Sequence, residues 1–327
     1  MNSISVDQRS TPVRDIDLEP AAVSISSGDA EHQQDGSWKE LELLRLTSVV
    51  VGGVRTPILH GGSDQSDEAA VFVHGNPGSS ADWQDLMERV SGFCRCIAPD
   101  MPGFGRSERS ENFDYTVSGY ARHLGSLLEK QHIRKAHLVL HDFGGPWGLS
   151  WATANPNALK SLTLINTGVL PDYRWHYLAQ IWRTPVLGEI FMASTTRLGF
   201  QILLKHGNPR GLSKAFVNGM YDNFDAGTKR AVLRLYRATN DPGAMAKEFG
   251  SLFRSLSCPT SVIWGRADPY IPVRYADMQR EFFASAEVNV LDQSGHWPFA
   301  DDPEAVAAIA VPFLRRATGC VEEINVG

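Results

Sequence analysis

Asp142 is the residue of this chain whose position most directly suggests chemistry. It lies in His141-Asp142-Phe143-Gly144-Gly145, directly after the apolar run Ala136–Leu140. A strand that ends in such a turn before a helix holds the central side chain above the edge of a sheet, beside a backbone N–H. A carboxylate is a weak nucleophile for acyl transfer, but it attacks saturated carbon when the leaving group is good or becomes protonated. The turn therefore indicates alkyl transfer rather than ordinary ester hydrolysis.

Two further segments could supply the partners of a carboxylate nucleophile, which are a base that activates water and an acid that orients the base. His296 lies in a loop after the expected strand Glu287–Leu291, and Asp268 follows the expected strand Thr260–Trp264. Considered alone, either residue could belong to an ordinary turn. Their positions at strand ends, in the order nucleophile, acid and histidine, predict a catalytic triad with Asp142.

Strands and helices alternate in the part of the chain that would position these residues. Apolar runs at Ala69–Val73, Arg95–Ala98 and Leu159–Ile165 are typical of buried strands, whereas Ser118–Gln131 and Trp147–Ala154 have the pattern of helices. This alternation predicts an α/β fold with a mostly parallel central sheet flanked by helices. Since the carboxyl ends of parallel strands meet at one edge, the three residues are expected to lie together there.

The sequence divides into three unequal parts. Residues 1–37 are rich in Ser, Asp, Gln and Glu and poor in aromatic residues, which predicts a disordered N-terminal tail. Residues 38–168 and 255–327 carry the α/β core. Residues 169–254 have helical patterns rich in Trp, Tyr, Arg and Leu and no convincing buried strand, so we interpret them as a helical cap inserted over the sheet edge. The alternative is ordinary helical packing.

Composition limits the classes of partner and cofactor. The formal net charge of -6 and the absence of a basic stripe argue against nucleic acid or a membrane as a partner. Without a secretory signal or a long apolar run, the protein is expected to be cytoplasmic. The four cysteines lack metal-ligand spacing, so neither a metal site nor another cofactor is expected. The oligomeric state cannot be inferred from these features.

The region from about residue 70 to about residue 315 resembles the α/β-hydrolase superfamily. Within it, the chain is similar to the branch of epoxide hydrolases and haloalkane dehalogenases, which use an aspartate nucleophile. The matching motifs are His74-Gly75-Asn76-Pro77, Pro99-Asp100 with Gly103-Phe104-Gly105-Arg106-Ser107, the Asp142 turn, Gly265-Arg266-Ala267-Asp268 and Gly295-His296. The resemblance implies an α/β-hydrolase fold with a cap and no cofactor.

The resemblance also implies roles for individual residues. Asp142 would attack carbon to form an alkyl-enzyme ester, and His296, oriented by Asp268, would activate the water that hydrolyses it. The backbone N–H groups of Asn76 and Phe143 would form the oxyanion hole for this hydrolysis. The peptide bond between Asn76 and Pro77 is expected to be cis.

Asn166 lies where some members of the branch carry the acid, about 24 residues after the nucleophile. An amide cannot supply the negative charge of a carboxylate. Asp268 is therefore preferred as the acid, and Asn166 is interpreted only as a polar residue at a strand end.

The leaving group distinguishes the two activities of the branch. Haloalkane dehalogenases commonly hold the halide with an Asn after His-Gly and a Trp directly after the nucleophile. Asn76 matches the first position, but Phe143 occupies the second and its side chain has no N–H donor. Removing one donor from such a site costs about 3 to 4 kcal/mol in oxyanion holes. Dehalogenation is therefore the less favoured activity.

Epoxide hydrolases use acidic donors on the cap, usually two tyrosines or a histidine and a tyrosine, to stabilise the ring oxygen as it leaves. The segment Leu233–Arg237 resembles the part of that family that carries one tyrosine donor, which would be Tyr236. Arg174–Leu178 resembles the first cap helix, where His176 is the expected second donor. Tyr177 or Trp175 would replace it if the alignment is shifted by one residue.

The sequence thus predicts an epoxide hydrolase that forms a vicinal diol through an ester on Asp142. A haloalkane dehalogenase is the alternative, and a non-catalytic ligand-binding homologue is a remote third hypothesis. The substrate would be a small hydrophobic epoxide or halogenated compound, with water as the second reactant. Four aromatic residues are candidates for the pocket wall: Trp175, Tyr177, Trp182 and Trp297.

Overall fold

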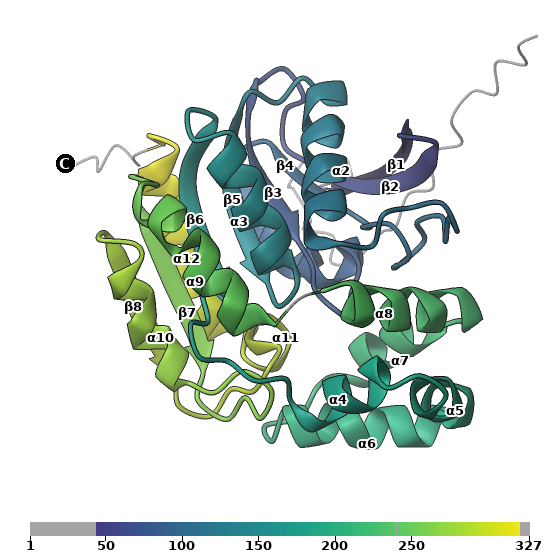
Figure 1. The fold of residues 1–327 in the computed structure, drawn as a ribbon. Coiled ribbons are helices and arrows are strands. Elements are labelled where there is room, and N and C mark those ends of the chain that lie inside the picture. Colours follow the sequence, from purple (N-terminus) through teal and green to yellow (C-terminus); the bar gives the residue numbers. More distant parts are fainter. Residues whose placement is uncertain (1–43, 240, 321–327) are drawn as a thin grey trace, which may run out of the picture.

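A sheet of eight strands lies at the centre of the computed structural model, which describes residues 44–239 and 241–320 (Figure 1). The strands are β1 (Leu44–Val51), β2 (Val54–Gly61), β3 (Glu68–Val73), β4 (Cys96–Pro99), β5 (Lys135–His141), β6 (Leu159–Ile165), β7 (Thr260–Gly265) and β8 (Ala286–Leu291). Their order across the sheet is β1-β2-β4-β3-β5-β6-β7-β8. β2 pairs antiparallel with both β1 and β4, and every pairing from β4 to β8 is parallel. The predicted tail, residues 1–37, lies outside the described residues.

Helices cover both faces of the sheet. The flanking helices are α1 (Gln84–Ser91), α2 (Val117–Lys130), α3 (Gly144–Ala154), α10 (Arg274–Met278), α11 (Pro298–Asp301) and α12 (Pro303–Ala317), with short 3-10 helices at Ser80–Trp83 and Gln279–Glu281. α2 packs against α3 on one face (Figure 1), and α1 packs against α12. The predicted α/β fold class with a mostly parallel sheet is confirmed.

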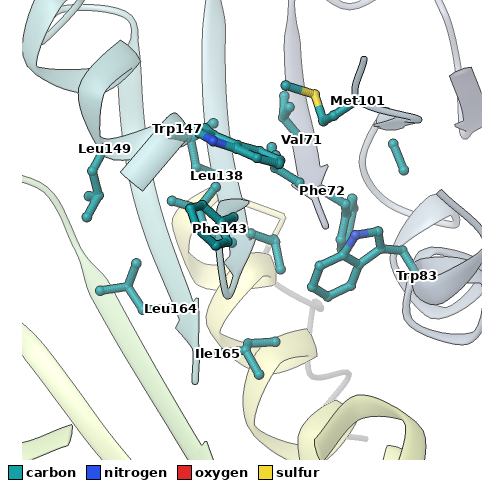
Figure 2. Close-up of a cluster of buried hydrophobic side chains, with 14 of the residues drawn as sticks. Val71, Phe72, Trp83, Met101, Leu138, Phe143, Trp147, Leu149, Leu164 and Ile165 are labelled. Carbon is teal, nitrogen blue, oxygen red and sulfur yellow. The ribbon is translucent and has the colours of Figure 1, made fainter. Parts of the chain in front are cut away.

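Buried apolar strands fix the position of the central turn. The side chains of β3 from Ala69 to Val73 are fully buried, as are those of β5 from Leu138 to Leu140. Strands buried on both faces need apolar residues at consecutive positions, which explains these runs. Figure 2 shows Phe143 and Trp147, from the turn after β5 and the start of α3, within this apolar cluster. The turn that carries Asp142 is thus held by the core on one side.

Six helices follow one another between β6 and β7. They are α4 (Tyr177–Arg183), α5 (Leu187–Ser194), α6 (Arg197–Gly207), α7 (Lys214–Asp222), α8 (Ala226–Ala238) and α9 (Pro242–Arg254). The side chains of Thr196, Ser213, Asp225 and Asp241 accept backbone N–H groups at the starts of α6 to α9. Such caps satisfy donors that a helix start leaves unpaired. In Figure 1, α4 to α8 lie beyond the carboxyl end of β5, whereas α9 lies beside α3. The exact cap boundaries, 169 and 254, stay a proposal.

Candidate active site

The backbone of Asp142 has a left-handed conformation, with φ of 48°, in the turn between β5 and α3. Two glycines permit the tight packing of this turn. A Cβ atom on Gly144 would lie 2.2 Å from the carbonyl oxygen of Val73, and one on Gly145 would lie 1.9 Å from Oγ1 of Thr167. The Thr167 hydroxyl also donates to the Asp142 carbonyl at 2.7 Å. The surrounding contacts hold Asp142 in this unfavourable backbone conformation, as is common at functional sites.

The loop after β3 approaches the Asp142 side chain closely. The backbone N–H of Asn76 donates to Asp142 Oδ1 at 2.7 Å, and the backbone N–H of Phe143 also hydrogen bonds to this carboxylate. A Cβ atom on Gly75 would lie 2.3 Å from the Asp142 Cβ, so glycine makes this approach possible. The peptide bond between Asn76 and Pro77 is cis, as expected. The two N–H groups lie where an oxyanion hole for an Asp142 ester would need them.

The three residues predicted to form a triad lie together at the carboxyl ends of the parallel strands. His296 Nδ1 lies 2.8 Å from Asp268 Oδ2. Since an ionised carboxylate can only accept, the ring nitrogen is the donor. In the neutral ring, Nε2 is then free of a proton, and it lies 3.7 Å from Asp142 Oδ2. His296 and Asp268 are both buried. This arrangement suits a base that Asp268 orients toward the ester carbon of an alkylated Asp142.

The electrostatic environment of this cluster opposes isolated charges. Burial lowers the affinity of His296 for a proton, but the neighbouring carboxylates of Asp268 and Asp142 outweigh burial and raise the pKa of His296 above its usual value. Burial raises the pKa of Asp142, which His296 and the backbone N–H groups of Asn76 and Phe143 counteract. Asp142 and His296 each favour the charged form of the other. Loss of the negative charge on Asp142 would therefore lower the pKa of His296.

Asn166 has a larger part in the site than the sequence suggested. It is fully buried, and its Nδ2 donates to Asp268 Oδ2 at 2.7 Å, the same oxygen that accepts from His296. The other oxygen of Asp268 accepts the backbone N–H groups of Tyr270 at 2.7 Å and Ile271 at 3.0 Å. Four donors thus surround one buried carboxylate, which fixes its orientation. The interpretation of Asn166 as merely a strand-end polar residue was incomplete.

The loop that carries His296 is anchored to the cap and to β5. The backbone N–H of His296 donates to the carbonyl of Gly207 at 2.9 Å, and that of Trp297 donates to Oδ1 of Asn208 at 2.9 Å. His141 Nε2 donates to the carbonyl of His296 at 2.7 Å. No local sequence motif predicts these contacts, because Gly207, Asn208 and His141 all lie far from the His296 loop in the sequence.

A cavity of about 410 Å³ opens above Asp142 between the sheet and the cap. Most of the predicted site and pocket residues line it: Asn76, Asp142, Phe143, Trp175, His176, Trp182, Tyr236, His296 and Trp297. The remaining lining is largely apolar. Such a cavity is suited to a small hydrophobic ligand that reacts at its polar base.

Tyr177 was wrongly predicted as a pocket residue. Its side chain is 49% exposed and does not line the cavity. His176 is the N-cap residue that begins α4, and successive residues of a helix are rotated by about 100° about its axis. Leu178 and Trp182, four residues apart, face the cavity, which leaves Tyr177 on the solvent side.

The two predicted cap donors lie near each other in the cavity, with ring centroids of His176 and Tyr236 6.2 Å apart. His176 Nδ1 accepts the backbone N–H of Ala179 at 3.2 Å, so Nε2 carries the proton of the neutral ring. Burial lowers the pKa of His176 to about 4 and raises that of Tyr236 well above its usual value. Both side chains are therefore neutral hydrogen-bond donors near pH 7.

Asn76 and several indoles supply further polar groups at the cavity. Asn76 Nδ2 lies 3.4 Å from the Tyr236 hydroxyl oxygen, a long contact in which the amide is the donor. This contact leaves the phenolic proton available for a ligand. The buried indole N–H groups of Trp175, Trp182 and Trp297 have no hydrogen-bond partner within the described part of the chain. The cavity therefore contains more donors than the protein itself uses.

Among residues 44–239 and 241–320, no three His, Cys, Asp or Glu side chains are grouped so as to hold a metal ion. No helix in those ranges combines the length and apolar character needed to cross a bilayer.

Known proteins with similar sequences and structures agree with this architecture. The family model of the alpha/beta hydrolase fold matches residues 71–303. A cis-3-alkyl-4-alkyloxetan-2-one decarboxylase from Shewanella oneidensis is 25% identical over 287 residues, which cover 82% of this chain and 88% of that protein.

Solved structures with the same fold include two from the branch that the sequence resembles. Haloalkane dehalogenase DbeA from Bradyrhizobium elkani superposes with a TM-score of 0.73 at 22% identity, over 85% of this chain and 100% of the other. Epoxide hydrolase VrEH1 from Vigna radiata superposes with a TM-score of 0.71 at 19% identity, over 85% of this chain and 100% of the other. The chain therefore belongs to the alpha/beta hydrolase family, with haloalkane dehalogenases and an epoxide hydrolase among the structures that it resembles.

Proposed function

We propose that the protein is an epoxide hydrolase that adds water to a hydrophobic epoxide through an ester on Asp142. The observation that carries the proposal is the pair of neutral donors, Tyr236 and His176, in the same cavity as the carboxylate. An epoxide oxygen leaves as an alkoxide unless a donor stabilises it, so a carboxylate nucleophile needs such donors opposite it. Phe143, directly after the nucleophile, offers a ring face without a side-chain donor.

In the first step, one carboxylate oxygen of Asp142 attacks a ring carbon, and the bond between that carbon and the epoxide oxygen breaks. The released electron pair stays on the oxygen, which takes the proton of Tyr236 and accepts a hydrogen bond from His176 Nε2. The raised pKa of Tyr236 keeps the phenol protonated until the more basic alkoxide forms. The product of this step is a hydroxyalkyl ester of Asp142.

In the second step, His296 Nε2 takes a proton from water, and the resulting hydroxide attacks the carboxyl carbon of the ester. The backbone N–H groups of Asn76 and Phe143 hold the oxyanion. When the intermediate collapses, the ester bond breaks, the diol oxygen takes the proton held by His296, and the acid proton left on Asp142 passes to the Tyr236 phenolate. The two protons of the water finally reside on this oxygen and on Tyr236, so the enzyme returns to its starting state. The overall reaction converts one epoxide and one water into a vicinal diol.

Haloalkane dehalogenation is a second candidate, favoured by one specific observation. The buried indole N–H of Trp175 has no partner among the described residues, and Trp175 lines the cavity, so it could replace the donor that Phe143 lacks. Together with Asn76 Nδ2 it would give a halide two N–H donors. This candidate ranks second, because the Asn76 amide already contacts Tyr236 and the cavity presents two O–H or N–H donors suited to oxygen.

A paired activity screen tests these functions. Purified protein is incubated with aryl and alkyl epoxides in one arm, with bromoalkanes in a second arm, and with a cis-dialkyl oxetan-2-one, the ring named for the Shewanella relative, in a third. Asp142→Ala protein is the control in each arm. Diol formation without halide release supports the proposal, and halide release with no diol would replace it by dehalogenation. Absence of turnover in every arm would favour the non-catalytic ligand-binding hypothesis.

A further inference from the structure

The cavity extends beyond the triad along one face of α3. This helix contributes Pro146, Leu149, Ser150 and Thr153 to the cavity lining. Their spacing of three, one and three residues places them on a single face. Because a helix rises 1.5 Å per residue, the lined face extends about 10 Å from Pro146 to Thr153. The cavity thus follows α3 for most of its length, away from Asp142.

The facing wall of this extension comes from α9. Pro242, Met245, Ala246, Phe249 and Phe253 line the same cavity and again lie on one helix face. Figure 1 shows α9 beside α3. We call the space between these two lined faces the α3–α9 groove. The apolar side chains of Leu149 and Met245 contribute to its walls.

Several polar groups in the cavity lining are already paired. Thr153 Oγ1 donates to the carbonyl of Ser150 at 2.9 Å. Thr116 Oγ1 lies 3.0 Å from Ser118 Oγ and accepts the backbone N–H of Gly119 at 3.1 Å. Glu248 lines the cavity with an exposed side chain, so its carboxylate keeps contact with water. The groove interior therefore suits an unbranched hydrocarbon chain better than a polar group.

A second apolar compartment lies in the cap. Phe191 and Met192 from α5, Phe200 and Leu204 from α6, and Phe224 line it. In Figure 1, α5 lies at the far end of the cap from α9. We call this compartment the cap compartment. The α3–α9 groove, the cap compartment and Asp142 all belong to the lining of this one cavity.

We propose that the α3–α9 groove binds one unbranched alkyl arm of the substrate while the cap compartment binds the other. The preferred epoxide is then internal, with an alkyl arm on each ring carbon, because a terminal epoxide would leave one compartment without ligand. Each methylene that enters an apolar site contributes up to about 0.8 kcal/mol, which corresponds to about fourfold in affinity. The substrate class rests on the proposed function, but binding of the arms does not require turnover.

Dialkyl ketones test the two compartments without a reaction. A ketone presents one oxygen to the cavity donors and two alkyl arms, and it has no ring to open. One arm is kept as methyl and the other is lengthened in steps from ethyl to dodecyl, with binding followed by calorimetry. Affinity is expected to rise up to about fourfold per methylene until the groove is filled, and then to stay constant. Affinity that does not change with length would overturn the proposal.

Variants identify which compartment binds the long arm. Ser150→Phe and Ala246→Leu each place a larger side chain in the α3–α9 groove. Each variant should bind the decyl ketone at least tenfold more weakly than the parent does. The shortest ketone should bind both variants within about twofold of the parent. Met192→Phe, which fills the cap compartment, is the matched control and should retain the gain with chain length. If only Met192→Phe removes this gain, the long arm lies in the cap compartment and the assignment is wrong.

Thermal unfolding of each variant is measured in parallel, and a variant that unfolds early is replaced by the other groove substitution. The outcomes separate the two proposals. Ketone binding with the expected variant pattern, in a protein that does not hydrolyse epoxides, would leave the groove assignment intact and overturn only the proposed reaction.

Discussion

The backbone N–H of Trp297 donates to Oδ1 of Asn208 at 2.9 Å, so a residue at the end of cap helix α6 holds the loop that carries the base. Asn208 is fully buried, and its Nδ2 donates to the carbonyl of Leu204 at 2.9 Å. A Cβ atom on Gly295 would lie 2.1 Å from the carbonyl oxygen of Gly207, so the cap and the loop are in close contact. A shift of this end of α6 would therefore displace His296.

Replacement of Asn208 should affect the second half-reaction more than the first. Asn208→Ala leaves the N–H of Trp297 without its acceptor, and an unpaired buried donor costs about 1 to 3 kcal/mol. We expect hydrolysis of the ester to slow by about tenfold, while alkylation of Asp142 changes less than threefold. Rapid-quench measurement of the ester during the first turnover separates the two rates.

Two further variants distinguish this positioning role from general damage to the cap. Thr228→Ala removes a buried hydroxyl of α8 that accepts a hydrogen bond from Arg109 at 3.2 Å, and it should leave both rates unchanged because Thr228 does not line the cavity. Asn208→Asp retains an oxygen acceptor and should recover part of the hydrolysis rate. Equal slowing of both steps in Asn208→Ala would contradict the assignment.

Replacement of the base should trap the ester. His296→Gln removes the group that takes a proton from water, whereas Asp142 can still attack, so the alkylated protein should accumulate. The intact mass of the protein should rise by the mass of the epoxide. Asp142→Ala protein serves as the control and should gain no mass. Protein that turns over without any adduct in His296→Gln would mean that water is activated elsewhere.

Replacement of Tyr236 should separate the two candidate leaving groups. Tyr236→Phe keeps the ring but removes the proton donated to the epoxide oxygen, and general-acid groups contribute typically 10²–10⁴-fold. Because His176 remains as a second donor, we expect epoxide opening to fall by about a hundredfold. Any release of bromide from a bromoalkane should change less than threefold. Equal losses in the two reactions would show that Tyr236 acts on packing rather than on the leaving oxygen.

The pH dependence should differ between the free enzyme and the ester intermediate. In the free enzyme, the carboxylates of Asp268 and Asp142 together outweigh burial and raise the pKa of His296. Alkylation neutralises Asp142, so one of these charges disappears and the pKa of His296 must fall. The base must be neutral to accept a proton, so hydrolysis is lost as pH falls through the lower value.

The measurement compares two titrations. NMR of the free protein gives the pKa of His296, and the rate of ester decay in single turnovers gives the pKa in the intermediate. We expect the acid limb of ester decay to lie below the NMR value. A limb at or above that value would mean that Asp142 does not contribute to the proton affinity of His296.

The sequence was most informative where function depends on a strand end followed by a short turn. Asp142 and Asp268 follow buried strands, His296 follows the half-buried edge strand β8, and parallel topology brings the three strand ends to one edge. The fold and the convergence of these three residues could therefore be predicted from local patterns. Their catalytic roles stay a prediction.

Details of the cap could not be predicted in the same way. Tyr177 differs from His176 by one position, but the 100° rotation between them decides which side chain faces the cavity. Asn208 acts through a backbone N–H of a distant loop, and a backbone partner leaves no sequence signal. Asn166 was underestimated because its importance depends on the position of Asp268, which is 2.7 Å away only after folding.

This proximity gives the most specific test of the acid. Asp268→Asn should reduce turnover by about 10³–10⁴-fold, as loss of the orienting carboxylate does in other triads.

Asn166 Oδ1 accepts the backbone N–H of Gly265, an interaction that a carboxylate at this position would preserve. The double variant Asp268→Asn, Asn166→Asp therefore exchanges amide and carboxylate without losing the hydrogen bond between them. We expect kcat for diol formation to be at least tenfold higher in the double variant than in Asp268→Asn. Asn166→Asp alone, which places two carboxylates in contact, should instead lower the unfolding temperature. If the double variant were no more active than Asp268→Asn, the charge near His296 would have to come from position 268 alone.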